Sequence, residues 1–341
     1  MFKFFAPHPA SGAGQGAWRK SRPERGTVVN DLSSRFRQYS THPTCRIIVD
    51  SCSDITRALA EELGVDLIQF PFVREDGEHL DDQFESISAA EFYGRMRKGE
   101  RVLTSSVPHG HFVEVFEVCA AAGIPTLYLS FTAGLSRSII DAQRAAEQVV
   151  EAHPGFDLAV IDNCQPSLSA TLLAEGAARM RDEGLSMREL AAWCDRVKPC
   201  IHGYFTLESL DWLVAGGRVP KAAATITAVL DMKANLAYDL DGALTLTGVS
   251  RGRKKAIKTI LKQLKENYEG DAAHPIAIVD ADCPADGDAI EQMVHDELGD
   301  DCPRIIRLTL DPTIGAHVGP GMVALSFWGT DRTSSTKRGK R

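Results

Sequence analysis

The sequence predicts an α/β protein with two domains, a parallel sheet covered by helices on both faces followed by a mixed-sheet α/β domain. Three observations lead to this prediction. Short apolar runs alternate with amphipathic segments of helical length from residue 45 to residue 198. Beyond Pro199, the turn signal Asp241-Gly242 stands between apolar flanks, which is typical of an antiparallel hairpin. The chain of 341 residues is also long enough for two cores.

In the first half, we expect strands at short apolar runs and helices where apolar residues recur every three or four positions. The expected strands are Arg46–Val49, Leu67–Val73, Thr126–Leu129 and Leu158–Ile161. The expected helices are Asp54–Leu63, Ser88–Arg97, Phe112–Ala122, Ser136–Val150, Ser167–Arg181 and Ser186–Val197. Ser88 with Glu91 and Ser186 with Glu189 form capping boxes, which mark the starts of two of these helices.

In the second half, the hairpin Tyr238–Leu244 makes the sheet mixed. The other expected strands are Ile201–Thr206, Ile276–Val279, Ile305–Leu310 and Met322–Trp328. The expected helices are Leu207–Ala215, a basic helix after Arg253, and Ala289–Leu298. We therefore divide the chain into a disordered arm at residues 1–43, domains at 44–198 and 199–329, and a disordered basic tail at 330–341.

Charge and cysteine content exclude several classes of protein. The formal net charge is −8, although residues 1–42 hold seven Lys and Arg against two acids, and the last ten residues hold five and no acid. The part between is therefore strongly acidic, which argues against a nucleic-acid partner. No apolar run approaches the ~18 residues of a membrane span. Eight cysteines without a CxxC or a zinc spacing predict a reduced, cytoplasmic protein with no metal.

Polar side chains follow the expected strands, at the edge where open α/β sheets bind ligands. Asp50 and Ser51 follow the first strand, and Thr132 follows the third. Two hydroxyl-rich runs, 104–106 and 132–136, each lead into a helix, so their hydroxyls and free N–H groups suit a carboxylate or a phosphate. Ordinary helix caps and turns explain the same residues.

Two further features point to an anion. His317 stands among Gly315, Gly319, Pro320 and Gly321, so we expect it on a pinned loop, donating a hydrogen bond to a small anion; a neighbouring carbonyl is the alternative partner. Arg218 and Arg251 precede or follow glycine corners in an acidic body. They predict a site for phosphate or an acidic partner surface, or else a solvated face.

Six short segments, in this order, resemble the DegV family of fatty-acid-binding proteins, which includes the acyl-binding subunit of bacterial fatty acid kinase. The resemblance covers roughly residues 46–328. The segments are Val49–Asp54, Thr104-Ser105, Gly134–Ser136, Gly216–Arg218 with Lys221-Ala222, Arg251–Ala256 and Gly315–Gly321.

The resemblance implies a non-catalytic protein that binds one long-chain fatty acid between its domains and needs no cofactor. A separate kinase subunit similar to dihydroxyacetone kinases would phosphorylate the bound carboxylate. The implied carboxylate ligands are Thr104, Ser105, Thr132, Ser136 and His317. Arg218 and Arg251 would serve the acyl phosphate and kinase docking. Ala133 and Arg137 depart from the family's Ser-Ser-Gly-Leu-Ser-Gly-Thr run, which leaves open the hydroxyl that meets the carboxylate.

Two alternatives remain at this point. A stand-alone hydrolase would use Ser136 or Ser51 with His317 and a strand-end aspartate, although the chain lacks a GxSxG nucleophile elbow. A lipid carrier or sensor without a kinase partner has the same sequence features as a kinase subunit.

Overall fold

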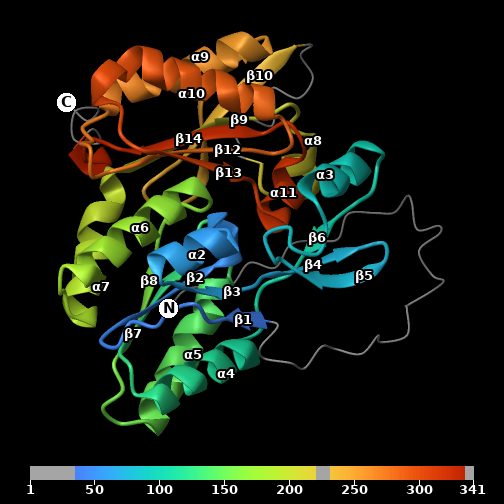
Figure 1. Ribbon diagram of the computed structural model, residues 1–341. Coiled ribbons are helices and arrows are strands. Elements are labelled where there is room, and N and C mark those ends of the chain that lie inside the picture. The colour runs from blue at the N-terminus through green and yellow to red at the C-terminus, as the bar shows by residue number, and fades with distance from the viewer. Residues whose placement is uncertain (1–34, 220–230, 335–341) are drawn as a thin grey trace, which may run out of the picture. The chain divides into compact units, whose positions relative to one another are not determined.

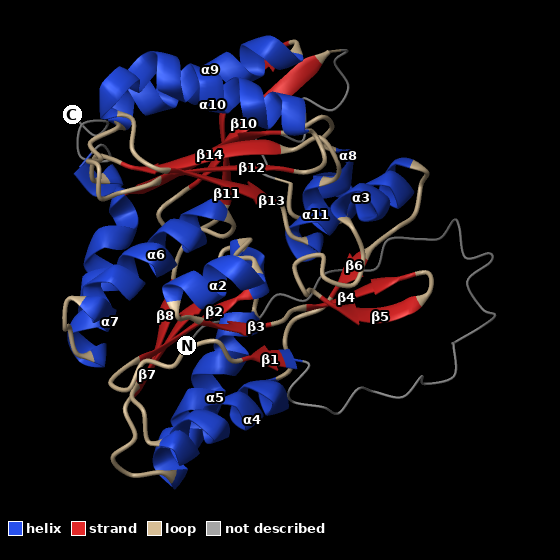
Figure 2. Ribbon diagram, in the orientation of Figure 1, coloured by secondary structure: helices blue, strands red, loops and turns tan. Residues whose placement is uncertain are grey.

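The computed structural model describes residues 35–219 and 231–334, and this part of the chain holds three sheets (Figures 1 and 2). The first sheet is parallel except for its antiparallel edge pair β1–β3. Its strands in spatial order are β1 (Phe36–Arg37), β3 (Asp66–Ile68), β2 (Arg46–Asp50), β7 (Thr126–Ser130) and β8 (Leu158–Asp162). This is the parallel sheet that the sequence predicts.

The second sheet is mixed, as predicted, because only its β12–β13 pair is parallel. Its strands in spatial order are β11 (Leu244–Arg251), β10 (Met232–Tyr238), β9 (Ile201–Thr206), β14 (Val323–Trp328), β12 (Ile276–Asp280) and β13 (Ile305–Thr309). A small antiparallel sheet that we did not predict consists of β5 (Gly77–Leu80), β4 (Pro71–Arg74) and β6 (Leu103–Thr104).

Helices cover the two larger sheets (Figure 1). Those beside the parallel sheet are α2 (Arg57–Leu63), α4 (His109–Ala122), α5 (Ser138–Ala152), α6 (Leu168–Asp182) and α7 (Met187–Val197). Those on the outer face of the mixed sheet are α9 (Arg253–Asn267) and α10 (Pro284–Leu298). The remaining helical segments are η1 (Ser51–Ser53), α3 (Ala89–Arg97), η2 (Lys198–Cys200), α8 (Asp211–Ala215), η3 (Gly299–Asp301) and α11 (Pro312–Val318). None of the described helices is long and apolar enough to cross a bilayer.

Helix α6 joins the two larger sheets. It contacts β2 and η1 on one side and β9, β12 and β14 on the other. A helix that packs on two sides must be apolar nearly all round, and the buried residues of α6 include Leu172, Leu173 and Ala177. At Gly176 a Cβ would lie 2.8 Å from the Trp193 ring, so the absence of a side chain lets the tryptophan pack directly on the helix. The two sheets therefore share one hydrophobic core.

Several element boundaries differ from the prediction. Helices α4 and α10 begin at His109 and Pro284, before the predicted Phe112 and Ala289. The segment expected as one strand, Leu67–Val73, is divided between β3 and β4 in different sheets, because the Phe70 N–H donates to the Ser51 hydroxyl and not to a neighbouring strand. Helix α2 begins at Arg57, since Asp54 adopts a left-handed φ of 60°. Helix α8 begins at Asp211 and not at residue 207.

The two predicted disordered ends are partly ordered. The arm at residues 1–43 contains strand β1, whose Phe36 is buried in the core and pairs with Ile68. In the predicted tail, the Arg332 guanidinium donates to the Tyr238 carbonyl at 2.8 Å. The expectation of disorder is therefore wrong for residues 35–43 and 330–334, while the rest of both ends lies outside the described residues. The described residues form one compact unit, so the boundary at 198–199 stays a prediction.

Candidate functional site

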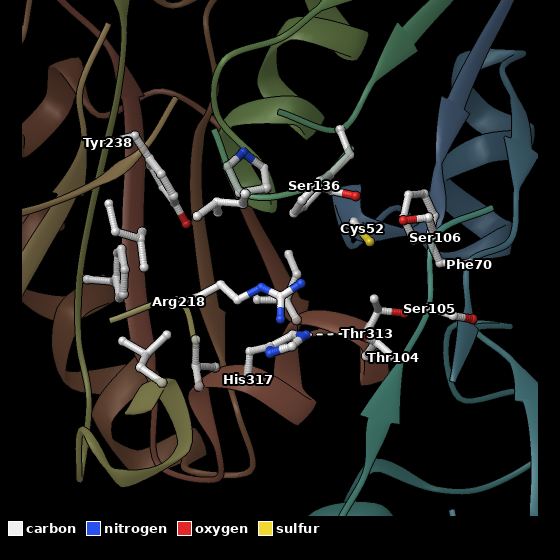
Figure 3. A pocket seen from close by; sticks show the side chains of 18 residues that line it. Cys52, Phe70, Thr104, Ser105, Ser106, Ser136, Arg218, Tyr238, Thr313 and His317 are labelled. Carbon is white, nitrogen blue, oxygen red and sulfur yellow. Dashed lines mark hydrogen bonds between the residues drawn. The ribbon is translucent and has the colours of Figure 1, made fainter. Parts of the chain in front are cut away.

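A cavity of about 340 Å³ lies between the first half of the chain and the second (Figure 3). This volume is within the range of about 300–1,000 Å³ that is usual for small-molecule sites. Most of the lining is apolar or aromatic. These residues are Phe70, Phe131, Leu135, Pro166, Phe205, Leu213, Tyr238, Leu244, Ile314 and Val318. The cavity therefore suits a ligand that is largely hydrocarbon.

Polar side chains make up the rest of the lining. The lining residues with a polar side chain are Cys52, Thr104, Ser105, Ser106, Ser136, Arg218, Thr313 and His317. Figure 3 shows Thr104, Ser105 and Ser106 along one wall, with His317 and Arg218 facing Thr104. The structure thus brings together five of the predicted site residues, namely Thr104, Ser105, Ser136, Arg218 and His317.

His317 lies on a helix, and the predicted loop is wrong. Asp311 caps helix α11 by accepting from the Ile314 N–H at 2.8 Å, and Pro312 occupies the first helical position. The sequence Asp311-Pro312 is a helix-start signal, which the neighbouring glycines outweighed in our prediction. Helix α11 ends at Gly319, whose φ is +74° and whose hypothetical Cβ would overlap with the Trp212 ring of α8. Glycine is therefore required where α11 meets α8.

The His317 ring is neutral. Its Nε2 lies 2.7 Å from the Thr104 hydroxyl, whereas its buried Nδ1 has no hydrogen-bond partner among the described residues. Burial, with a smaller contribution from the nearby positive charge of Arg218, lowers the pKa of His317 from 6.5 to about 4. A neutral imidazole carries one N–H donor and one acceptor. His317 can therefore donate one hydrogen bond to a ligand without first being protonated.

The two predicted phosphate arginines differ in position. Arg218 is exposed, its guanidinium donates to the Gly216 carbonyl at 2.5 Å, and Figure 3 shows it beside the His317 ring. Arg251 is an exposed residue at the end of β11 and does not line the cavity. Of these two arginines, Arg218 lines the cavity and Arg251 does not, so the role of Arg251 stays a prediction.

Thr132 is not part of the cavity lining. Its buried hydroxyl donates to the Gly242 carbonyl at 3.2 Å and accepts from the Gly134 N–H at 3.1 Å. A Cβ at either glycine would overlap with the other loop, so the Thr132–Gly134 turn rests directly on the β10–β11 turn. The tertiary contact uses the hydroxyl that we assigned to the carboxylate, and within residues 132–136 the cavity lining includes the Ser136 hydroxyl and the apolar side chain of Leu135.

Asp50 and Ser51 are likewise outside the lining and support it. Asp50 accepts from the Phe131 N–H at 2.5 Å and the Cys52 N–H at 3.1 Å, and burial raises its pKa to about 7. The Ser51 hydroxyl accepts from the Phe70 N–H at 3.1 Å. These bonds fix η1 so that Cys52, which our sequence reasoning did not select, faces the cavity.

The residues that we expected for a hydrolase, His317 with Ser51 or Ser136, do not form a triad. The hydroxyl nearest to the His317 ring belongs to Thr104 and not to Ser51 or Ser136, and no carboxylate bonds the Nδ1 that would need orientation. The Ser51 hydroxyl is engaged with the backbone of Phe70. The arrangement is that of a binding site with donors at its wall.

Comparisons with known proteins concern the family and the fold of this chain. The family model described as "Uncharacterised protein, DegV family" matches residues 44–329. A DegV domain-containing protein of Clostridium perfringens is 29% identical over 83% of this chain and 97% of its own length. Among solved structures, a Thermotoga maritima protein reported to reveal a fatty acid binding function has a TM-score of 0.70 at 25% identity, over 85% of this chain and 100% of that one. The Streptococcus pneumoniae Fatty Acid Kinase (Fak) B3 protein, solved with linoleic acid, has a TM-score of 0.71 at 20% identity, over 84% and 100%.

Proposed function

Because the chain belongs to the DegV family, we propose that it binds one long-chain fatty acid in the cavity beside His317 and presents the carboxylate to a separate kinase subunit. The observation that carries this proposal is a largely apolar cavity whose polar lining groups are hydroxyls, one thiol, one neutral imidazole and one arginine. Fatty-acid-binding relatives with the same fold support it. The proposal needs no cofactor.

The apolar lining supplies the affinity. Burying a chain of about sixteen carbons at ~0.8 kcal/mol per methylene gains on the order of 10 kcal/mol, before the costs of association are subtracted. The head group then needs only a few directed donors to fix its place. Thr104, Ser136 and His317 offer such donors without a fixed positive charge.

The position of the polar groups favours presentation to a partner. Ser105, Ser106 and Arg218 line the cavity and are also exposed to solvent, so this part of the cavity is near the surface. In the proposed reaction, a carboxylate oxygen attacks the terminal phosphorus of a nucleoside triphosphate held by the kinase. The bond from that phosphorus to the bridging oxygen breaks, and the products are an acyl phosphate and a nucleoside diphosphate. Arg218 would offset negative charge on the phosphoryl group during its transfer.

The test begins with denaturation of the purified protein and mass spectrometry of the lipids that are released. We expect about one long-chain fatty acid per chain, and less in His317→Ala. Recovery of empty protein, even after addition of fatty acid, would refute the binding proposal.

The kinase step is tested by adding a DegV-partner kinase subunit and ATP and measuring acyl phosphate. We expect Arg218→Ala to keep its lipid and lose most turnover, while Arg196→Ala, at an exposed position on α7, behaves as the parent protein. Turnover that is equal in all three proteins would remove the proposed role of Arg218. Lipid binding without turnover would leave a carrier or sensor.

A further inference from the structure

Three aspartate carboxyls meet in the interior next to the cavity wall. Asp54 follows η1, Asp81 follows β5, and Asp311 caps α11, and each has 0% of its surface exposed. Burial of one carboxyl without a cation is costly, and burial of three in contact requires a specific arrangement. None of the three has a role in the proposed chemistry.

The hydrogen bonds of this cluster tie α11 to the first half of the chain. Asp54 Oδ1 accepts from the Asp311 N–H at 2.8 Å, and Asp81 Oδ2 accepts from the Thr313 hydroxyl at 2.7 Å. Asp311 Oδ1 accepts from the Ile314 N–H at 2.8 Å, which caps the same helix. The start of α11 is thus held by two acids that come from segments more than two hundred residues away in the sequence.

The contacts among the carboxyls require a proton. One carboxyl oxygen of Asp311 lies within 4.8 Å of one of Asp81, the Asp54 carboxyl accepts from the Asp311 N–H, and Asp311 Oδ2 is buried without a donor from any described residue. Two ionised carboxylates in contact in a medium of low dielectric repel each other strongly, so one of them takes up a proton. The Asp54 and Asp81 carboxyls already accept from Ser167, Thr313 and Gln83, whereas Asp311 Oδ2 has no donor, so a proton on Asp311 turns that orphaned atom into a donor.

We propose that Asp311, protonated and hydrogen-bonded between Asp54 and Asp81, is a positioning residue that locks the start of α11 and thereby sets the cavity wall at Thr313, Ile314 and His317. The hydrogen bonds of Asp54, Asp81 and Asp311 hold the start of α11 whether or not a ligand is bound. Only the effect of this lock on fatty acid binding rests on the proposed function.

The titratable groups around Asp311 all oppose its ionisation. They are Asp54 and Asp81 beside it, and Cys52, Tyr93 and Tyr238 further out. Burial raises the pKa of Asp54 to about 6, and burial together with the two neighbouring acids raises the pKa of Asp311 well above its ordinary value. The folded state therefore holds a proton that the unfolded chain releases near pH 4. The resulting stability is complete below that pH and is lost as the pH rises toward the folded pKa, at about tenfold in the unfolding constant per pH unit for one proton.

The test compares Asp311→Asn with the parent protein in urea unfolding from about pH 4 to about pH 8, using lipid-free protein. The amide keeps the shape and the donor but cannot titrate. We expect the unfolding constant of Asp311→Asn to depend on pH less steeply, by about tenfold per pH unit, than that of the parent. Asp300→Asn, at an exposed position, should leave the slope unchanged. An unchanged slope in Asp311→Asn would overturn the proposal.

Lipid affinity is the second measurement. We expect Asp311→Asn to bind a fluorescent fatty acid as the parent does, and Asp311→Ala, which removes both the cap and the donor, to bind about tenfold more weakly. Equal loss in both variants would contradict a role for a neutral donor. If the parent binds no fatty acid while the pH slopes differ as expected, the lock stands and the proposed function fails.

A divalent cation is the competing occupant, because the Cys52 sulfur and one oxygen each of Asp81 and Asp311 lie within 4.8 Å of one another. Titration of the parent and of Asp311→Asn with Zn²⁺ or Mg²⁺ alone separates the two. Stoichiometric binding that disappears in Asp311→Asn would overturn the proton in favour of a metal. Equal binding, or none, in both proteins supports the proton.

Discussion

Replacement of His317 by glutamine should change how the stability of the protein depends on pH. The unfolded chain protonates this histidine near pH 6.5, whereas in the folded protein burial lowers its pKa to about 4. A histidine whose folded pKa is depressed stabilises the fold above pH 6.5, and this contribution is lost as the pH falls toward 4. The difference between these pKa values corresponds to about 3 kcal/mol of unfolding free energy at ~1.4 kcal/mol per pKa unit. Glutamine does not titrate, so the variant should lack this loss.

The assay is urea unfolding of lipid-free protein, followed by tryptophan fluorescence, at about pH 7 and about pH 4.5. The change in unfolding free energy between the two pH values should differ between parent and His317→Gln by about 2–3 kcal/mol. His202→Gln is a matched control, because burial also lowers the pKa of His202 to about 4 and this residue does not line the cavity. Both variants should show the altered pH dependence of stability, and only His317→Gln should also lose lipid affinity. If the unfolding free energy of His317→Gln depends on pH as that of the parent does, the conclusion that His317 is buried and neutral in the folded protein is refuted.

The other predictions concern single contacts at the site. A Cβ at Gly216 would overlap with the Nδ1 atom of His317, so Gly216→Ala should displace the ring and weaken fatty acid binding about tenfold in a fluorescence titration, whereas Gly110→Ala, which has open space around it, should not. Equal affinity in the two alanine variants would contradict this. Thr132→Ala should lower the unfolding free energy by about 1 kcal/mol with lipid affinity unchanged, because its hydroxyl serves a tertiary contact. Ser136→Ala should weaken lipid binding and also lower the unfolding free energy, because its hydroxyl lines the cavity and accepts from the Ser138 N–H at 3.2 Å. Weaker lipid binding in Thr132→Ala with unchanged binding in Ser136→Ala would return the head group to Thr132.

Much of the fold could be predicted from periodicity, since most expected strands and helices are found within a few residues of their observed bounds. What failed depended on tertiary partners. The apolar run from residue 67 to residue 73 gives no sign that its two halves belong to different sheets. Phe36 has no periodic neighbours, and only its pairing with β3 makes residue 36 part of the core.

The residues that line the cavity could be predicted better than the residues that hold them in place. The hydroxyls at 104 and 105, the imidazole at 317 and the arginine at 218 are sequence signals because they stand beside glycines or helix starts. Thr132 has the same local signal, and only the contact with Gly242 reveals that its hydroxyl is used elsewhere. Asp81 and Asp311 carry no local signal of their meeting, because hydrogen bonds across the fold bring them together.

The charge of the acid cluster affects where in the cavity the carboxylate of the proposed ligand is most stable. Cys52 and Thr313 form part of the cavity wall, and the carboxyls of Asp81 and Asp311 lie next to them. A fatty acid carboxylate on the other side of that wall would be repelled by three ionised aspartates in an interior that screens charge poorly. A proton held on Asp311 reduces this repulsion, and Arg218 on the solvent side attracts the head group toward the exposed hydroxyls. Both effects act in the same direction, so the carboxylate is most stable near the surface, where a second protein can reach it.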